Sequence, residues 1–310
     1  MTATLVPPVT PWLAGVGRRP LVSRLRAFER YFTRVLPPAA DPPARLHAAM
    51  RYAALAPGKR LRPLLVLTAC EAVGGRWARA LPAAAAVECV HAFSLVHDDL
   101  PAMDDDDYRR GRLTTHKKFG EALGLLAGDA LLALAFEELS RLSGGGVPPP
   151  RVTRAVRVLA EAAGSRVLVG GQVLDLEGEG TAHVNGTGVR EIHLRKTGGL
   201  ISASLVLGGL AGGASAARLR VLAGMGLELG LAFQIHDDLL NQASSLARLG
   251  KRAGTDAARA KATYPRAVGA ERARAEAARL LLSALDGVER LGPRAGNLGH
   301  LIIAVAERDR

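Results

Sequence analysis

An acidic run is the part of this chain most able to do chemistry. It reads DDLPAMDDDD from Asp98 to Asp107 and continues into Tyr108, Arg109 and Arg110. Six carboxylates in ten residues repel one another unless a cation lies among them. Carboxylate oxygens are ligands that Mg²⁺ prefers, commonly together with the phosphate oxygens of a substrate. Because guanidinium groups bind phosphates through charge-assisted hydrogen bonds, the run predicts a site for magnesium and a phosphorylated ligand.

A solvated acidic loop is the alternative explanation, since most charge runs lie on the surface. The apolar residues LVH before Asp98 argue against it, because they place the start of the run inside a buried helix. A second aspartate pair, Asp237-Asp238, follows the similar residues QIH. On a helix, Gln234 would share a face with both of these aspartates. Two helices that each carry such a pair could face each other and hold a metal ion between them.

The elements that must position these residues are helices. Apolar spacing and Pro or Gly breakers predict helices at 21–36, 45–55, 63–72, 82–100, 120–142, 151–176, 189–210, 218–240, 271–291 and 298–307. No strand-like alternation bounded by hairpin turns stands out. Residues 1–20 contain four prolines and two glycines and are interpreted as a flexible leader. The prediction is an all-α fold, with residues 21–310 forming one large helical bundle.

The composition agrees with a globular, aliphatic protein. Of 310 residues, 48% are hydrophobic and only 4% are aromatic, so the core is expected to consist mainly of Ala and Leu. A formal net charge of +12 suits an anionic partner, which could be nucleic acid, a membrane surface or a phosphorylated metabolite. Nucleic acid is disfavoured because no lysine-rich run or aromatic-basic stripe is present.

Two further observations bear on location. Cys70 and Cys89 are isolated thiols in apolar stretches, which indicates a reduced, cytoplasmic protein. Residues 197–217 carry no charge over 21 positions, long enough to cross a bilayer. Their many Gly, Ser and Ala residues instead favour a buried helix, so no stable membrane insertion is expected.

Taken in order, these motifs resemble the trans-isoprenyl diphosphate synthases, especially those of the bacterial farnesyl diphosphate synthase kind. The matching segments are GKRLRP (58–63), LVHDDLPAMDDDDYRRG (95–111), GDALLALAF (128–136), GGQVLDLE (170–177), KTG (196–198), GLAFQIHDDLL (230–240) and LGKRAGTDAARAKATYP (249–265). The resemblance covers roughly residues 20–310. It implies an isoprenoid synthase fold, a helical bundle around a central substrate cavity.

The resemblance also implies a reaction. Mg²⁺ bridges an allylic diphosphate, such as dimethylallyl or geranyl diphosphate, to both aspartate motifs. Departure of diphosphate leaves an allylic cation, which the double bond of isopentenyl diphosphate attacks. The released diphosphate then accepts a proton, so no protein base is nominated. By this reading Mg²⁺ binds Asp98, Asp104 and Asp237, while Asp99 and Asp238 support it.

The other site residues follow from the same resemblance. Isopentenyl diphosphate would be held by Gly58, Lys59, Arg62, His91 and Arg110, and the allylic diphosphate by Arg109, Lys196, Thr197, Gln234, Lys251 and Lys261. The residues expected to act in catalysis are Asp98, Asp99, Asp104, Arg109, Lys196, Asp237 and Lys251. Pro101 is expected to end its helix so that Asp104 can fold back toward Asp98.

Product length is expected to depend on Phe93, which lies five residues and about 7.5 Å below Asp98 along a helix. A ring there would close the pocket early, which favours farnesyl over geranylgeranyl diphosphate. Ser94 is small and adds no block. Asn241 departs from the family pattern, because a third aspartate is usual there; Ser244-Ser245 and Ala260 depart as well. These departures leave a slower enzyme possible.

Several alternatives stay open. One is a geranylgeranyl diphosphate synthase; another is a weakly active or non-catalytic partner subunit, although such partners usually lose the first aspartate motif. A terpene cyclase would share the chemistry of magnesium and diphosphate but should lack GKRLRP. The family further implies a homodimer.

Overall fold

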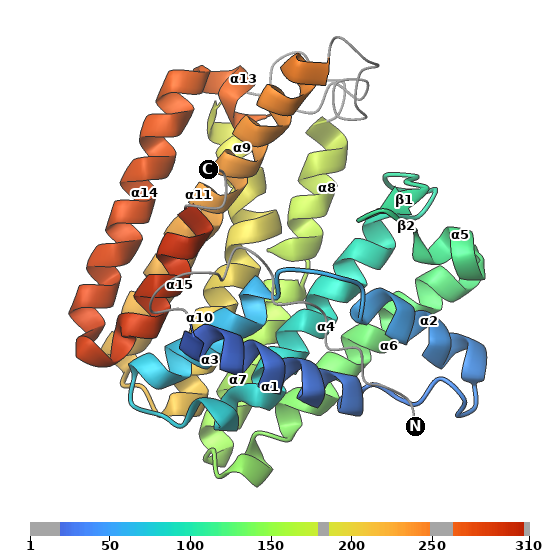
Figure 1. Ribbon diagram of the computed structural model, residues 1–310, viewed down its shortest axis with the longest axis horizontal. Coiled ribbons are helices and arrows are strands. Elements are labelled where there is room, and N and C mark those ends of the chain that lie inside the picture. Colours follow the sequence, from blue (N-terminus) through green and yellow to red (C-terminus); the bar gives the residue numbers. More distant parts are fainter. Residues whose placement is uncertain (1–18, 179–185, 249–262, 307–310) are drawn as a thin grey trace.

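The structure of this chain is a computed structural model that describes residues 19–178, 186–248 and 263–306 (Figure 1). Side chains are described over the same ranges, except for 243–248. The leader expected at 1–20 lies almost wholly outside the described residues, as do Lys251, Ala260 and Lys261. The roles assigned to these segments stay predictions.

Helices build nearly all of the described chain, and the expected all-α bundle is confirmed (Figure 1). Helix α4 (Leu81–Asp98) packs against α3 (Leu61–Ala72) and α6 (Glu121–Ser140), and α10 (Gly199–Gly212) packs against α3 and α11 (Ala216–Arg248). The other elements are α1 (Arg19–Val35), α2 (Ala44–Ala54), α5 (Thr115–Phe119), α7 (Pro149–Ala163), α8 (Leu168–Gly178), α9 (Gly186–His193), α13 (Tyr264–Val268), α14 (Ala270–Leu291) and α15 (Gly296–Ala306), the short 3₁₀ turns η2 (Trp77–Ala80), η3 (Ser143–Gly145) and η5 (Pro293–Ala295), and the π-helical turn η4 (Leu194–Gly198).

Small and aliphatic side chains let the core helices approach closely. Helices α3, α4 and α10 are buried along most of their lengths. A Cβ on Gly208 of α10 would collide with the carbonyl oxygen of Val66 on α3, so only glycine permits this approach. The uncharged stretch at 197–217 lies mainly in α10 and is a buried helix, as predicted.

Among the described residues, one helical run, Trp77–Asp98, is long and apolar enough by composition to span a membrane. The bundle buries 72% of its most apolar window. Its apolar character is therefore accounted for by packing against the neighbouring helices.

The expectation that no strands form is wrong at one place. Tyr108–Arg109 (β1) and Arg112–Leu113 (β2) pair as a minimal antiparallel hairpin. Its two turn residues, Arg110 and Gly111, have φ angles of 53° and 74°. Two consecutive positive φ angles match the twist of a hairpin. Arginine in the first position carries no turn signal, and each strand is too short to show alternation.

Two predicted helices are interrupted. The helix expected at 151–176 breaks after Ala163, where Gly164 ends α7, and α8 starts only at Leu168. The helix expected at 189–210 widens into the π-helical turn η4. Apolar periodicity continues across both interruptions, so the pattern alone could not reveal them.

Candidate active site

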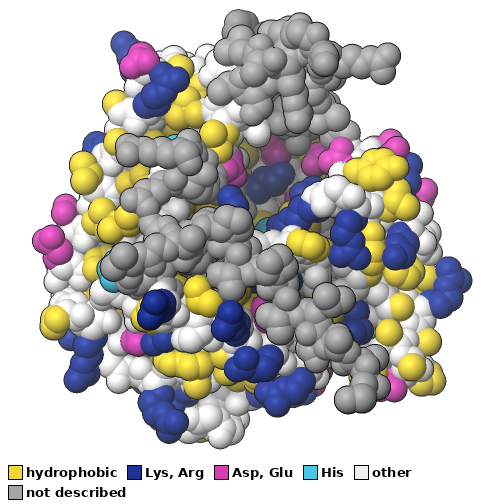
Figure 2. Space-filling model, in the orientation of Figure 1, with side chains coloured by type: hydrophobic (Ala, Val, Ile, Leu, Met, Phe, Trp, Pro, Cys, Tyr) yellow, Lys and Arg dark blue, Asp and Glu magenta, His cyan; other side chains and the backbone are white. Residues whose placement is uncertain are grey.

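A cavity of about 300 Å³ runs through the bundle beside the acidic run. Its walls come from α3, α4, α8, η4 and α10, and the lining residues include Arg62, His91, Phe93, Ser94, His97, Asp98, Gln172, Lys196, Thr197 and Leu200. The space-filling view shows a hollow between the α8–α11 end of the molecule and the β1–β2 hairpin, with acidic and basic side chains facing into it (Figure 2).

Asp98 and Asp104 form the first acidic wall. Helix α4 ends at Asp98, and the chain after Pro101 turns back so that the Asp104 amide donates to the Asp98 carbonyl oxygen at 2.8 Å. The Pro101 break thus gives the expected return of Asp104. Burial raises the pKa of the Asp98 carboxyl, and the charges of Asp104 and Asp175 raise it further, against the opposing effect of Lys196. Carboxylates held this close favour the presence of a cation.

Asp175 is a site residue that sequence reasoning did not nominate. It lies on α8, and its Oδ2 accepts a hydrogen bond from Lys196 Nζ at 2.7 Å. Lys196 belongs to the π-helical turn η4, a feature common at functional sites. A Cβ on Gly171 would crowd the Lys196 amide, so this glycine lets α8 approach η4. The motif GGQVLDLE could have identified Asp175, because it places this aspartate one helical turn after the glycine pair.

The second wall lies on α11 and is tied to the same turn. Thr197 Oγ1 donates to Gln234 Oε1 at 2.9 Å. The Asp237 charge opposes the lowering of the Arg62 pKa. Because Lys196 bonds to α8 and Thr197 bonds to α11, η4 links these two helices.

Asp238 has a different surrounding from Asp237. It is buried, accepts the Tyr264 amide at 2.9 Å and lies 3.4 Å from His193 Nε2. Burial lowers the pKa of His193 to about 4, so this imidazole is neutral near pH 7. Asp238 therefore fastens the start of α13 and a face of α9 to α11.

A cluster of arginines forms a cationic pocket around His91. Burial lowers the pKa of His91 well below its usual value, and the charges of Arg62, Arg110, Arg60 and Arg109 lower it further. Burial likewise lowers the pKa of Arg62, and no residue that the structure describes forms a hydrogen bond with its Nε. Neutral imidazole beside guanidinium groups with unused donors is an arrangement suited to an anion such as diphosphate.

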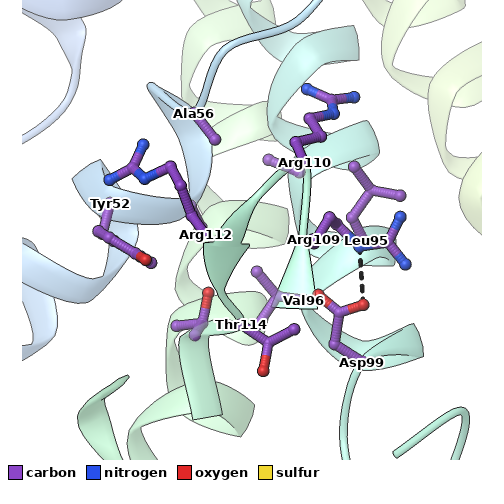
Figure 3. A pocket seen from close by; sticks show the side chains of 12 residues that line it. Tyr52, Ala56, Leu95, Val96, Asp99, Arg109, Arg110, Arg112 and Thr114 are labelled. Carbon is purple, nitrogen blue, oxygen red and sulfur yellow. Dashed lines mark hydrogen bonds and ion pairs between the residues drawn. The ribbon is translucent and has the colours of Figure 1, made fainter. Parts of the chain in front are cut away.

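The β1–β2 hairpin directs its arginines to different places (Figure 3). Arg109 Nε donates to Asp99 Oδ1 at 2.7 Å, Arg110 Nη1 donates to the Pro57 carbonyl oxygen at 2.6 Å, and the Arg112 guanidinium lies 4.2 Å from the centre of the Tyr52 ring. The Arg110 guanidinium fills the space where a Cβ on Gly58 would stand. Only glycine at position 58 therefore permits this placement of Arg110.

Asp99 differs from Asp98 in its partner. It is 3% exposed, and burial raises its pKa to about 6 although Arg109 acts to lower it. Its carboxylate contacts the Arg109 guanidinium. Asp99 therefore supports the site by holding Arg109 in place.

Comparison with known proteins gives a match to the polyprenyl synthetase family over residues 43–290. The chain belongs to this family. It is 49% identical to the heterodimeric geranylgeranyl pyrophosphate synthase large subunit 1 of Arabidopsis thaliana, over 79% of this chain and 67% of that protein. It is 44% identical to the geranylgeranyl pyrophosphate synthase of Catharanthus roseus, over 86% of this chain and 75% of that protein.

Solved structures of polyprenyl synthetases have the same fold. The FPP/GFPP synthase of Zymomonas mobilis matches with a TM-score of 0.80 and 36% identity, over 90% of this chain and 95% of that one. The geranylgeranyl pyrophosphate synthetase of Pyrococcus horikoshii matches with a TM-score of 0.81 and 30% identity, over 93% and 97%. The resemblance to isoprenyl diphosphate synthases is confirmed, and the chain is a prenyltransferase that elongates prenyl chains. The preference for a farnesyl product is not confirmed, because these curated relatives are named geranylgeranyl synthases.

The carboxylates of this synthase suit a hard cation. Within the described residues, no group of three or more His, Cys, Asp or Glu side chains lies close enough to hold a metal ion alone. Mg²⁺ does not require one, because it is commonly held by one or two carboxylates together with substrate phosphates. Burial and the charge of Asp104 raise the pKa of Asp98 although Lys196 and Arg109 act to lower it, so a cation bound there would stabilise the charged carboxylate. The donor set therefore fits magnesium.

Phe93 and Ser94 line the cavity of the synthase, as the product-length prediction requires. The Phe93 ring packs edge-on against His97, with 5.0 Å between ring centres. The other apolar lining residues come mainly from α8, among them Leu168, Val169 and Val173. A prenyl tail in this cavity would contact both the Phe93 ring and the α8 side chains.

Proposed function

We propose that this protein condenses isopentenyl diphosphate with an allylic diphosphate, forming a prenyl diphosphate longer by five carbons and releasing diphosphate. The observation that carries the proposal is one cavity bordered by two unlike anion sites. Arg62 and the neutral His91 line the cavity with the Arg110 charge close by, which gives a mainly cationic site, whereas Asp98 and Lys196 provide a mixed wall of a carboxylate and a cation. Two diphosphates that must be distinguished need two such sites.

The residues have separate roles in this reaction. Arg62 and Arg110 bind the diphosphate of isopentenyl diphosphate, and neutral His91 adds a hydrogen bond. Lys196, Arg109 and Gln234 orient the allylic diphosphate. Asp98, Asp104 and Asp237 would hold Mg²⁺, which neutralises charge on the departing diphosphate. The apolar α8 side chains exclude water from the allylic carbon, so the double bond of isopentenyl diphosphate is the nucleophile available to it.

An elongation assay tests the proposal. Purified protein is incubated with Mg²⁺, labelled isopentenyl diphosphate and dimethylallyl, geranyl or farnesyl diphosphate, and products are sized by chromatography. We expect labelled products one or more C5 units longer than each accepted starter. Failure to elongate any of the three would exclude the proposal and favour a non-catalytic partner subunit. The intact first aspartate motif argues against such a subunit.

We propose geranylgeranyl diphosphate as the main product, because the curated relatives described above are named geranylgeranyl synthases. Farnesyl diphosphate is a second candidate, which the aromatic ring of Phe93 at the cavity wall favours. The assay separates the two by whether farnesyl diphosphate is consumed as a starter or accumulates as the product.

Replacing Phe93 with Ala is expected to lengthen the product beyond that of the parent enzyme, because removal of the ring opens space along the tail. The measurement is the product distribution at matched turnover. Ser94→Ala serves as the control, because it removes only a hydroxyl oxygen from the neighbouring cavity-lining residue. It should leave the product distribution unchanged. An unaltered product in the Phe93 variant would remove this residue from length control.

Replacing Asn241 with Asp is expected to lower the Mg²⁺ concentration required for half-maximal activity by about 2- to 10-fold. The reason is that the substitution adds one carboxylate that can attract or bind the metal ion. Asn241 lies one turn after Asp237 on α11. Activity is measured as Mg²⁺ is titrated at saturating substrates. An unchanged midpoint would mean that position 241 does not face the metal.

A homodimer and a cytoplasmic location are also proposed. Helix α6 leaves the large apolar side chains of Leu125 and Leu126 nearly half exposed. Exposed apolar side chains of this size favour a partner surface. The heterodimeric relative named above makes a related second chain an alternative partner. The two cysteines of the chain are both buried free thiols, in keeping with a reducing compartment.

A further inference from the structure

Arg60 lies within the GKRLRP motif but does not line the cavity. It precedes α3 with a φ of 50°, a left-handed conformation that is rare for a residue with a side chain. Its side chain is buried and bonds two carboxylates, with Nε 2.8 Å from Glu29 Oε1 and Nη1 2.6 Å from Glu88 Oε1. A strained backbone that serves a buried contact indicates that the contact matters.

Glu88 is the reason why this contact concerns the active site. It lies on α4, one helical turn before His91, and only 4% of it is exposed. Its charge acts on Arg60, Arg62 and Arg110 together. A buried carboxylate near three guanidinium groups will pair with whichever of them it can reach. If it paired with Arg62 or Arg110, it would occupy the donors that the isopentenyl diphosphate needs.

We propose that Arg60 is a positioning residue that engages the buried Glu88 carboxylate, and so keeps the Arg62 and Arg110 guanidinium groups available for isopentenyl diphosphate. The inference rests on the proposed function. The observed contacts agree with it: Arg60 bonds to Glu88 and Arg110 Nη1 bonds to a backbone carbonyl, while Arg62 Nε has no hydrogen-bond partner among the described residues.

Steady-state kinetics of Arg60→Met test the proposal. Without the Arg60 guanidinium, Glu88 is expected to draw Arg62 or Arg110 away from the pocket. The KM for isopentenyl diphosphate should then rise about tenfold or more, the size of one lost charge-assisted hydrogen bond. The KM for the allylic diphosphate should stay within about twofold, since the acidic wall does not depend on this pair.

The double variant Arg60→Met/Glu88→Gln distinguishes positioning from simple damage. Removal of the unpaired carboxylate should restore the KM for isopentenyl diphosphate to within about threefold of the parent value. If Arg60 served only to hold the fold together, the KM for isopentenyl diphosphate would rise in the double variant at least as much as in Arg60→Met. Persistence of the high KM, or an equal rise in the allylic KM, would overturn the proposal.

Two further variants keep the test decisive if Arg60→Met does not fold. Glu88→Gln leaves Arg60 bonded to Glu29 and should not raise the KM for isopentenyl diphosphate; a tenfold rise would contradict the proposal. Arg24→Met removes a comparable ion pair, in which Arg24 on α1 lies 2.6 Å from Glu71 on α3. Neither of these residues lines the cavity. Both KM values should be unchanged in that control. Absence of elongation by the parent protein would instead disprove the proposed function.

Discussion

Replacing Asp98 with Asn is expected to lower kcat by about 1,000-fold, the scale on which removal of one essential transition-state contact acts. Burial, Asp104 and Asp175 raise the pKa of the Asp98 carboxyl against the effect of Lys196 and Arg109, so a bound cation would stabilise its charged form. Asparagine keeps the size and one oxygen but removes the charge. Neutralisation of the departing diphosphate would then be weaker at the moment when its charge develops.

A matched control is available in the same acidic run. Asp105 is exposed, and its φ of 45° is a conformation that Asn adopts readily. Asp105→Asn makes the same chemical change seven residues away and should keep kcat within about twofold. Rates are measured at saturating isopentenyl and allylic diphosphates across a range of Mg²⁺ concentrations. Equal losses in both variants would mean that net charge, not the position of Asp98, matters.

Replacing Arg62 with Met is expected to raise the KM for isopentenyl diphosphate by about 10- to 100-fold, because about 1.5–3 kcal/mol is lost with a charge-assisted hydrogen bond. The same change should stabilise the substrate-free protein. Burial lowers the pKa of Arg62 and Arg110 repels it, against the effect of Glu88 and Asp237, and within the described part of the chain its Nε has no hydrogen-bond partner. Replacement of a poorly paired buried charge by an apolar chain of similar length is expected to gain about 1 kcal/mol.

The two effects of Arg62→Met are measured separately. Thermal unfolding of the substrate-free protein reports stability, and steady-state kinetics report the KM for each substrate. A rise in Tm together with a loss of isopentenyl diphosphate binding would identify Arg62 as a residue kept for function at a cost in stability. A fall in Tm, or an unchanged KM, would show that Arg62 holds the fold together and does not bind substrate.

The conformation of the first aspartate motif could be predicted from the sequence because it depends on local rules. Pro101 cannot continue a helix, so the helix that carries Asp98 had to end nearby, and Asp104 could return toward it. The buried α10 was equally predictable, since its uncharged stretch is rich in small residues that suit close packing. The order of the motifs was sufficient to place the chain among the isoprenyl diphosphate synthases.

Other features were decided by tertiary structure alone. The contact between Lys196 and Asp175 depends on the approach of α8 to η4, and the different surroundings of Asp237 and Asp238 depend on where α9 and α13 pack against α11. The Arg60–Glu88 pair likewise joins residues from different elements. Helical periodicity and breakers act over a few neighbouring residues, so they determine elements; the burial, charge and contacts of a side chain depend on which distant helix lies opposite. The sequence by itself thus determined the helices and their motifs, while packing decided which carboxylates face the cavity and which serve as anchors.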